Sequence, residues 1–296
     1  MIRHLFFFLI LLLILVSCEK NINIKLDPSS TDLVVDGSIE NGEYPVIFLS
    51  RSLAYFSKID PHVLTASFVH NATVTLSNGY AIGQLKEDSL VLDSSDLAIY
   101  FYTFKNGDPG IFKGDFNTGY SLKIEVDSKT YLATTTIPLL TKTIDSLWWV
   151  PPPNNLDSAL AVVKARINDP KGLGNYTRYF TSVNSGPFYP GLQSVFDDQV
   201  TDGTMYTVSV DKGVNRNEKI DFNTYAFFNR GDSVVVKLSD IDKGTYDFWR
   251  TMEYNYQSIG NPFSTPTEVI SNISNGALGY FGGYASQYVR LNIPPN

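Results

Sequence analysis

The fold class is decided by the stretch Tyr120-Ser121-Leu122-Lys123-Ile124-Glu125-Val126. Apolar residues occupy every second position of this stretch, and polar residues fill the positions between them. Because successive side chains of a strand point to opposite faces, the alternation predicts a half-buried β-strand. The Thr-rich stretch Tyr131–Ile137 follows after Asp127-Ser128-Lys129, and we predict that the two stretches pair across this turn.

The same period of two recurs along the chain. It is found at Leu33–Val35, Pro45–Leu49, Ala72–Ser77, Ala161–Ile167, Tyr176–Val183, Met205–Val210 and Val234–Leu238. Strands at this spacing predict a mainly β protein built as antiparallel sandwiches. One amphipathic helix is predicted near residues 240–257, with Ser239 as its N-cap and Asp242 three residues further on.

Two β-sandwich-like domains are predicted. Pro138 and the stretch Trp148–Asn155, which contains three consecutive prolines, interrupt the strand pattern. We therefore expect an N-terminal domain at residues 32–140 and a β-rich C-terminal domain at residues 141–296, which contains the predicted helix. The chain beyond Gly260 is rich in Pro, Ser, Asn and Gly, and no strand is predicted there.

The N-terminus indicates that the protein is directed to a membrane. An apolar run of 12 residues, Leu5–Val16, follows Arg3 and is too short to span a bilayer, so residues 1–17 are predicted to be a signal peptide. The sequence Leu15-Val16-Ser17-Cys18 resembles the bacterial lipobox, in which the cysteine is lipidated after cleavage. Cys18 is the only cysteine of the chain. We expect a lipid anchor on Cys18 and a polar tether at residues 18–31.

Composition excludes two classes of protein. A single cysteine among 296 residues cannot form a disulfide scaffold within the chain. The formal net charge of −7 disfavours nucleic-acid binding, because phosphate neutralisation needs a basic surface.

The sequence contains no recognisable catalytic constellation. Beyond the predicted signal peptide only His62 and His70 are present, and no Gly-x-Ser-x-Gly elbow occurs. We therefore predict a protein that is not an enzyme and carries no cofactor. Asp240-Ile241-Asp242 resembles the start of a calcium loop, but helix capping explains the same residues. Asp197, Asp198 and Asp202 are weak candidates for a metal site, with a turn as the alternative.

Aromatic residues are the remaining candidates for binding. They make up 14% of the chain. A candidate aromatic binding face comprises Trp148, Trp149, Tyr280 and Phe281, which could stack on a sugar or on a partner protein. Ordinary core packing is the alternative interpretation of these side chains.

Several segments, in their order and spacing, resemble a Bacteroidota lipoprotein family of unknown function, domain-of-unknown-function family 4249. They are Ser17–Lys20, Leu33–Gly42, Phe48–Ser52, Ala72–Leu76, Gly119–Leu122, Ile144–Leu147, Asn261–Ser264, Asn272–Ile273 and Gly276–Phe281. The resemblance implies a gene often found beside TonB-dependent receptors, and an immunoglobulin- or transthyretin-like first domain. It supplies no catalytic residues.

Together these observations predict an outer-membrane lipoprotein that is a non-enzymatic accessory or ligand-binding component of a TonB-dependent uptake system, with a β-barrel receptor as partner. The sequence does not choose between the periplasmic and the external side. The alternatives are a surface hydrolase acting on glycans or peptides, and a structural or adhesive surface module.

Overall fold

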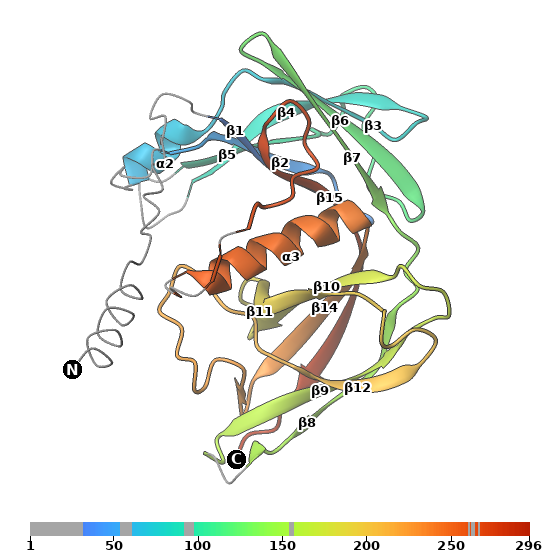
Figure 1. Ribbon diagram of the computed structural model, residues 1–296, viewed down its shortest axis with the longest axis vertical. Helices are drawn as coiled ribbons and strands as arrows, with labels where there is room; N and C mark the ends of the chain where they lie inside the picture. Colours follow the sequence, from blue (N-terminus) through green and yellow to red (C-terminus); the bar gives the residue numbers. More distant parts are fainter. Residues whose placement is uncertain are drawn as a thin grey trace, which may run out of the picture. The chain divides into compact units, whose positions relative to one another are not determined.

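The computed structural model describes residues 32–53, 61–91, 98–153, 157–259, 261, 264–265 and 267–296. The predicted signal peptide, the tether and the lipidation site Cys18 lie outside these residues. The described part is mainly β, as the alternating pattern predicts (Figure 1). None of its helices has the length and apolar character needed to cross a membrane.

The secondary structure follows in chain order. Up to residue 140 the elements are β1 (Leu33–Glu40), β2 (Val46–Arg51), α2 (Pro61–Ser67), β3 (Thr73–Ser77), β4 (Ile82–Val91), β5 (Ala98–Thr103), β6 (Thr118–Val126) and β7 (Lys129–Ile137). Beyond residue 140 they are β8 (Thr143–Val150), β9 (Leu160–Asn168), β10 (Tyr176–Val183), β11 (Tyr189–Phe196), β12 (Met205–Val210), β13 (Phe228–Asn229), β14 (Ser233–Ile241), α3 (Lys243–Ser258) and β15 (Leu278–Asn292).

The predicted hairpin of β6 and β7 is confirmed. In β6 the side chains of Tyr120, Leu122 and Ile124 are buried, and the polar residues between them face outward. The strands pair from Thr118–Ile137 to Val126–Lys129, so Asp127 and Ser128 alone form the turn. Both turn residues have positive φ, 50° and 59°, which matches the twist of a two-residue hairpin.

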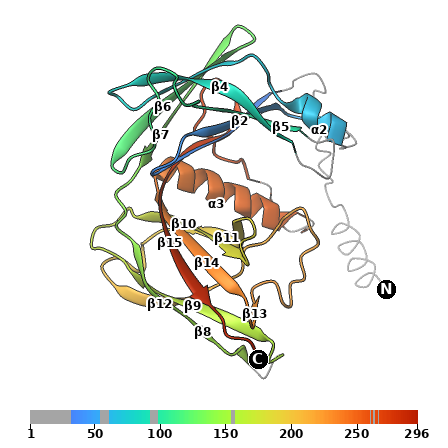
Figure 2. The same cartoon turned by 180° about the vertical axis from the view of Figure 1, so that it is seen from behind.

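Strand β15 lies inside the described sheet, between β14 and β1. Eleven of the described strands form one sheet in the order β11-β10-β14-β15-β1-β2-β5-β4-β3-β6-β7. The first part of β15 pairs parallel with β1, and its second part pairs antiparallel with β14 (Figure 2). The sequence prediction missed this strand. Residues 280–286 are buried on both faces of the sheet, so they show no alternation of polar and apolar residues.

The first hydrophobic core lies among strands β1 to β7 and the start of β15. It contains Val35, Ile47, Leu76, Leu122 and Phe281. The sheet curves so that β7 lies against β15, where the Gly283 amide donates a 2.7 Å hydrogen bond to the Thr135 hydroxyl. This contact encloses the core between strands that are distant in the sheet order.

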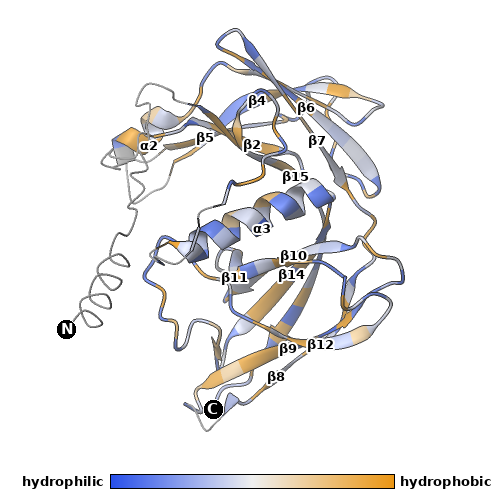
Figure 3. Ribbon diagram, in the orientation of Figure 1, coloured by the Kyte–Doolittle hydropathy of each residue, from blue (hydrophilic) through white to orange (hydrophobic). Residues whose placement is uncertain are grey.

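The second core lies between two sheets. Strands β8, β9 and β12 form a smaller sheet that faces β10, β14 and the end of β15, and β13 adds to β9. Between them lie Ala161, Val163, Phe228, Val234 and Val236. Figure 3 shows the hydrophobic residues along β9. This half of the chain is therefore a β-sandwich, as predicted.

Helix α3 covers the other face of this part of the sheet, where it contacts β10, β11 and β15 (Figure 1). Its N-cap is Asp242, whose Oδ1 accepts a 2.8 Å hydrogen bond from the Thr245 amide. The predicted N-cap, Ser239, lies instead in β14, where its hydroxyl contacts that of Ser286 at 2.8 Å. The sheet pairing of β14 with β15 continues through Ile241, so the helix begins later than the local sequence suggests.

The predicted division at residue 140 is not confirmed. Residues Asp32–Asn296 form one compact unit, and the eleven-stranded sheet contains strands from both predicted domains. Trp148 and Trp149 lie inside β8, which pairs with β9, so the proline run ends a strand rather than separating two domains.

Candidate functional site

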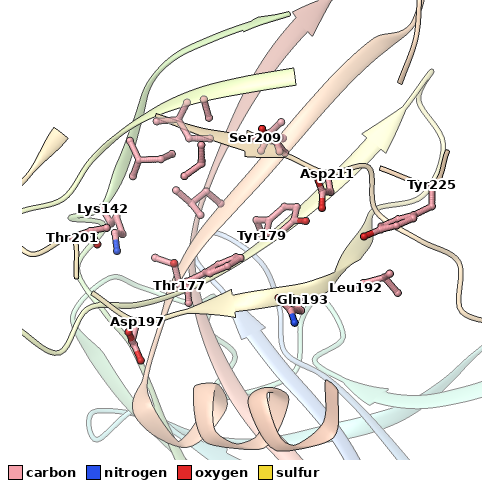
Figure 4. Close-up of a pocket in the computed structure, with 18 of the residues that line it drawn as sticks. Lys142, Thr177, Tyr179, Leu192, Gln193, Asp197, Thr201, Ser209, Asp211 and Tyr225 are labelled. Atoms are coloured by element: carbon pink, nitrogen blue, oxygen red, sulfur yellow. The ribbon is translucent and has the colours of Figure 1, made fainter. Parts of the chain in front are cut away.

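The candidate site is a cavity of about 950 Å³ within the second sandwich (Figure 4). One wall is formed by β9 and β12, with Ala165, Ile167 and Val210. The opposite wall is formed by β10 and β14 and includes Tyr179 and Val236. Protein interiors contain few voids larger than a water molecule, so a space of this size between two sheets is not ordinary core packing.

The mouth of the cavity is apolar. The four lining residues with exposed apolar side chains are Phe196, Val208, Phe222 and Ile259. Phe222 and Ile259 are 72% and 77% exposed, and they come from the segment after β12 and from the end of α3. Exposed apolar surface around a cavity indicates a surface that an apolar ligand or partner can cover.

A buried ion pair closes one end of the cavity. The Lys142 ammonium lies 2.8 Å from Oδ2 of Asp169, and both side chains are almost completely buried. The same Asp169 oxygen accepts a 2.6 Å hydrogen bond from the Thr201 hydroxyl. Because both charges are compensated within the protein, this end holds the start of β8 against the end of β9 and leaves no charge for a ligand.

Asp240 fixes the chain beside that ion pair. Its Oδ2 accepts hydrogen bonds from the amides of Thr141 and Lys142, at 2.7 and 3.0 Å. Burial nevertheless raises the pKa of Asp240 above its ordinary value, against the effect of these bonds. The carboxylate of β14 thus positions the segment that carries Lys142.

Polar groups also meet at another side of the cavity, where the hydroxyls of Tyr179 and Tyr225 and the carboxylate of Asp211 point toward one another (Figure 4). We call these three residues the polar corner. Burial raises the pKa of Tyr179, and the negative charges of Asp211 and Glu253 add to the effect. Burial also raises the pKa of Asp211. The corner is therefore a partly buried place of negative potential.

The predicted metal candidates form a turn. Asp198 accepts hydrogen bonds from the amides of Gly174 and Asn175, at 3.1 and 3.0 Å, and Asp202 accepts one from Gly172 at 2.6 Å. Burial opposes the charged form of Asp198, but these backbone hydrogen bonds outweigh it and lower its pKa. Asp197 accepts a 3.0 Å hydrogen bond from the Tyr246 hydroxyl. Within the described ranges, no group of three or more His, Cys, Asp or Glu side chains could hold a metal ion.

The four residues of the predicted aromatic face lie in different surroundings. Phe281 is fully buried in the first core, and Tyr280 stacks on Phe248 with ring centroids 4.5 Å apart. Trp149 packs against the second core under the Arg230 guanidinium, and Trp148 is half-buried in β8. The expectation of one exposed binding face is therefore wrong for Tyr280 and Phe281, because β15 places both inside the protein.

Sequence reasoning missed the polar corner and found only part of its surroundings. Tyr179 lies in a predicted strand, but Asp211 and Tyr225 come from the segment between β12 and β13, which has no periodic pattern. No spacing in the sequence connects these three residues. Of the three predicted metal candidates, Asp197 alone lines the cavity.

Another polar cluster on the opposite face of the sheet has a structural role. The Arg178 guanidinium lies between the rings of Trp249 and Phe180, at 3.4 and 4.7 Å from their centroids. Its Nε donates a 3.0 Å hydrogen bond to the Ser194 hydroxyl, which in turn contacts buried Glu253 at 2.5 Å. These contacts attach α3 to β10 and β11.

The fold and the site define a class: a mainly β protein whose second sandwich contains an open, apolar cavity with one polar corner. The chain belongs to the family described as Domain of unknown function (DUF4249), whose model matches residues 19–289. The predicted membership of that family is thereby confirmed. A comparison with curated proteins found no match.

Proposed function

We propose that this protein is a non-enzymatic, ligand-binding lipoprotein of the outer membrane, in which the cavity of the second sandwich holds a small, largely apolar molecule. The observation that carries the proposal is the open cavity of about 950 Å³ with apolar walls and an apolar mouth. Ligand sites in proteins are typically concave, mostly apolar spaces of about 300–1,000 Å³ with a few converging polar groups.

Apolar walls hold such a molecule through the hydrophobic effect. Burying about 300 Å² of apolar ligand surface contributes on the order of 7 kcal/mol, at roughly 25 cal/mol per Å². Lost translational and rotational freedom offsets part of this, so affinities in the micromolar range are reasonable.

The state of the charged groups supports binding rather than catalysis. Lys142 is paired with Asp169, and Asp197 is hydrogen-bonded to Tyr246. Asp197 and Asp211, the two carboxylates that line the cavity, lie on different sides of it (Figure 4). A glycosidase would need two carboxyl groups facing one another across a substrate bond.

The membrane location and the partner of the protein are also proposals. The lipobox-like sequence ending at Cys18 supports a lipid anchor, and more than one acyl chain gives stable membrane attachment. The resemblance to a family whose genes often lie beside those of TonB-dependent receptors is the support for a receptor partner. Co-purification of the chain from membranes with a β-barrel receptor is the expected result, and recovery of the chain alone under gentle detergent would contradict this part.

The cavity itself is tested by filling it. Val208 of β12 lines the cavity, whereas its exposed neighbour Thr207 is not among the lining residues. With 4-phenylbutanol as the probe, Val208→Trp in the full-length chain should weaken binding about tenfold by calorimetry. The matched variant Thr207→Trp should bind as the wild type does. Equal binding by both variants would refute the cavity as the ligand site.

A further inference from the structure

The polar corner contains a carboxylate without a partner. No hydrogen bond or ion pair joins Asp211 to any residue that the structure describes, and the same holds for the hydroxyls of Tyr179 and Tyr225. The three groups are nevertheless close enough for the charge of Asp211 to raise the pKa of both tyrosines, after the larger effect of burial. Polar groups that converge without bonding to one another keep their hydrogen-bonding capacity for a ligand that reaches all of them.

The other charged groups of the cavity cannot supply that donor. The Lys142 ammonium is held by Asp169 at 2.8 Å, at another side of the cavity. Asp197 is acidic and is engaged by Tyr246. Within the described part of the cavity, Asp211 is therefore the carboxylate to which the protein gives neither a hydrogen bond nor an ion pair.

The corner is held in place by the backbone around it. The Lys212 amide donates to the Ala226 carbonyl at 3.2 Å, which fixes the residue after Asp211 beside the residue after Tyr225. The Gly213 amide donates to the Thr181 hydroxyl at 2.7 Å and so ties this segment to β10. Sites whose polar groups are fixed before binding lose less conformational freedom when the ligand arrives.

A glycine makes room for the Tyr179 hydroxyl. A Cβ at position 191 would lie 2.0 Å from that oxygen, so only glycine allows the ring to keep its position over β11. The Tyr179 ring also stacks on Phe196, with centroids 6.1 Å apart. The position of the Tyr179 ring beside the carboxylate is therefore fixed by packing within the sandwich.

We propose that the polar corner binds the protonated amine of an amphipathic organic cation, whose apolar part occupies the rest of the cavity. The ammonium would donate to the Asp211 carboxylate and lie against the aromatic rings of Tyr179 and Tyr225. Charge-assisted hydrogen bonds and cation–π contacts are the interactions that proteins use for such groups. The inference rests on the proposed function and adds the ligand class.

The electrostatics of Asp211 support this chemistry. Burial raises the pKa of its carboxyl, because the charged form loses water and gains no partner. A bound ammonium would compensate the charge, whereas a carboxylate ligand would add a second negative charge to the same place.

The test compares three molecules with one apolar part and different head groups: 4-phenylbutylamine, 4-phenylbutanol and 4-phenylbutyrate. Calorimetry on the full-length chain at pH 7 should give about tenfold tighter binding of the amine than of the alcohol, and the weakest binding for the carboxylate. Asp211→Asn should remove the preference for the amine, so that the amine and the alcohol bind with similar affinity. Asp197→Asn, which changes the carboxylate already engaged by Tyr246, should keep the preference.

The possible outcomes test the ligand class and the proposed binding function separately. Equal binding of amine and alcohol by the wild type, or an amine preference that survives Asp211→Asn, would overturn the ligand class while the cavity remains a binding site. If none of the three molecules binds to the wild type, the proposed function fails together with the ligand class.

Discussion

Gly283 lies where β15 passes closest to β7. A Cβ at this position would be 2.4 Å from the Thr136 carbonyl oxygen and 2.8 Å from the Ile137 nitrogen. These neighbours belong to the backbone of a paired strand, so they cannot move aside as a flexible side chain can. The contact between the two strands therefore depends on the absence of a single methyl group.

We predict that Gly283→Ala lowers the free energy of unfolding by about 3 kcal/mol, at the upper end of the usual range for overpacking. Urea unfolding followed by circular dichroism measures this change. The control is Gly119→Ala in β6, where a Cβ would meet its nearest atom at 3.9 Å and φ is not positive. A loss at Gly119 as large as the loss at Gly283 would show that crowding against β7 is not the cause.

Helix α3 is attached to the first half of the chain through its own N-cap. While Oδ1 of Asp242 caps the helix, its Oδ2 accepts hydrogen bonds from the Thr135 hydroxyl and the Thr136 amide, at 2.8 and 2.9 Å. Thr135 also accepts the hydrogen bond from Gly283. One carboxylate thus connects α3 with β7 at the point where β7 meets β15.

Asp242→Ala should therefore cost more stability than an exposed N-cap does, about 2–3 kcal/mol instead of about 1 kcal/mol. Asp242→Asn keeps an oxygen for the Thr245 amide but replaces an acceptor of β7 by an NH₂ group, so we expect an intermediate loss. Chemical denaturation of the two variants gives the comparison. Equal losses would mean that the contact with β7 adds nothing to the cap.

The elements that the sequence predicts well are those with one solvent-exposed face and one buried face. Leu122 and Ile124 alternate with Ser121 and Lys123, so the period of two is visible in β6. Strand β15 is the opposite case, because its central residues are buried by the first core on one side and by α3 on the other. Its residues Gly279 and Gly283 allow close packing of β1 and β7.

At the scale of the whole described unit, β15 joins two cores that the sequence assigns to separate domains. Phe281 of this strand belongs to the first core, and Val289 and Leu291 pack against the second. Because one strand is hydrogen-bonded in both halves, loss of either half exposes its edge. We therefore expect the two halves to unfold together.

We predict that Phe228→Ala, which removes a fully buried ring from the second core, lowers stability by about 3–5 kcal/mol in both halves. Hydrogen exchange measures this directly, because amides of β6 and β9 should lose protection by the same free energy. Unchanged protection of β6 would instead support two independently stable domains divided near residue 140.

The sequence by itself determined the β class, the hairpin of β6 and β7, the approximate place of α3 and the family, because each depends on local periodicity, turn residues or the order of motifs. Tertiary structure alone decided that β15 joins β14 to β1 within one sheet, that Tyr280 and Phe281 are buried, and that Tyr179, Asp211 and Tyr225 meet at one corner of a cavity. These features depend on contacts between residues far apart in the chain. Neither the packing of two sheets nor the space left between them has a period that a sequence can display.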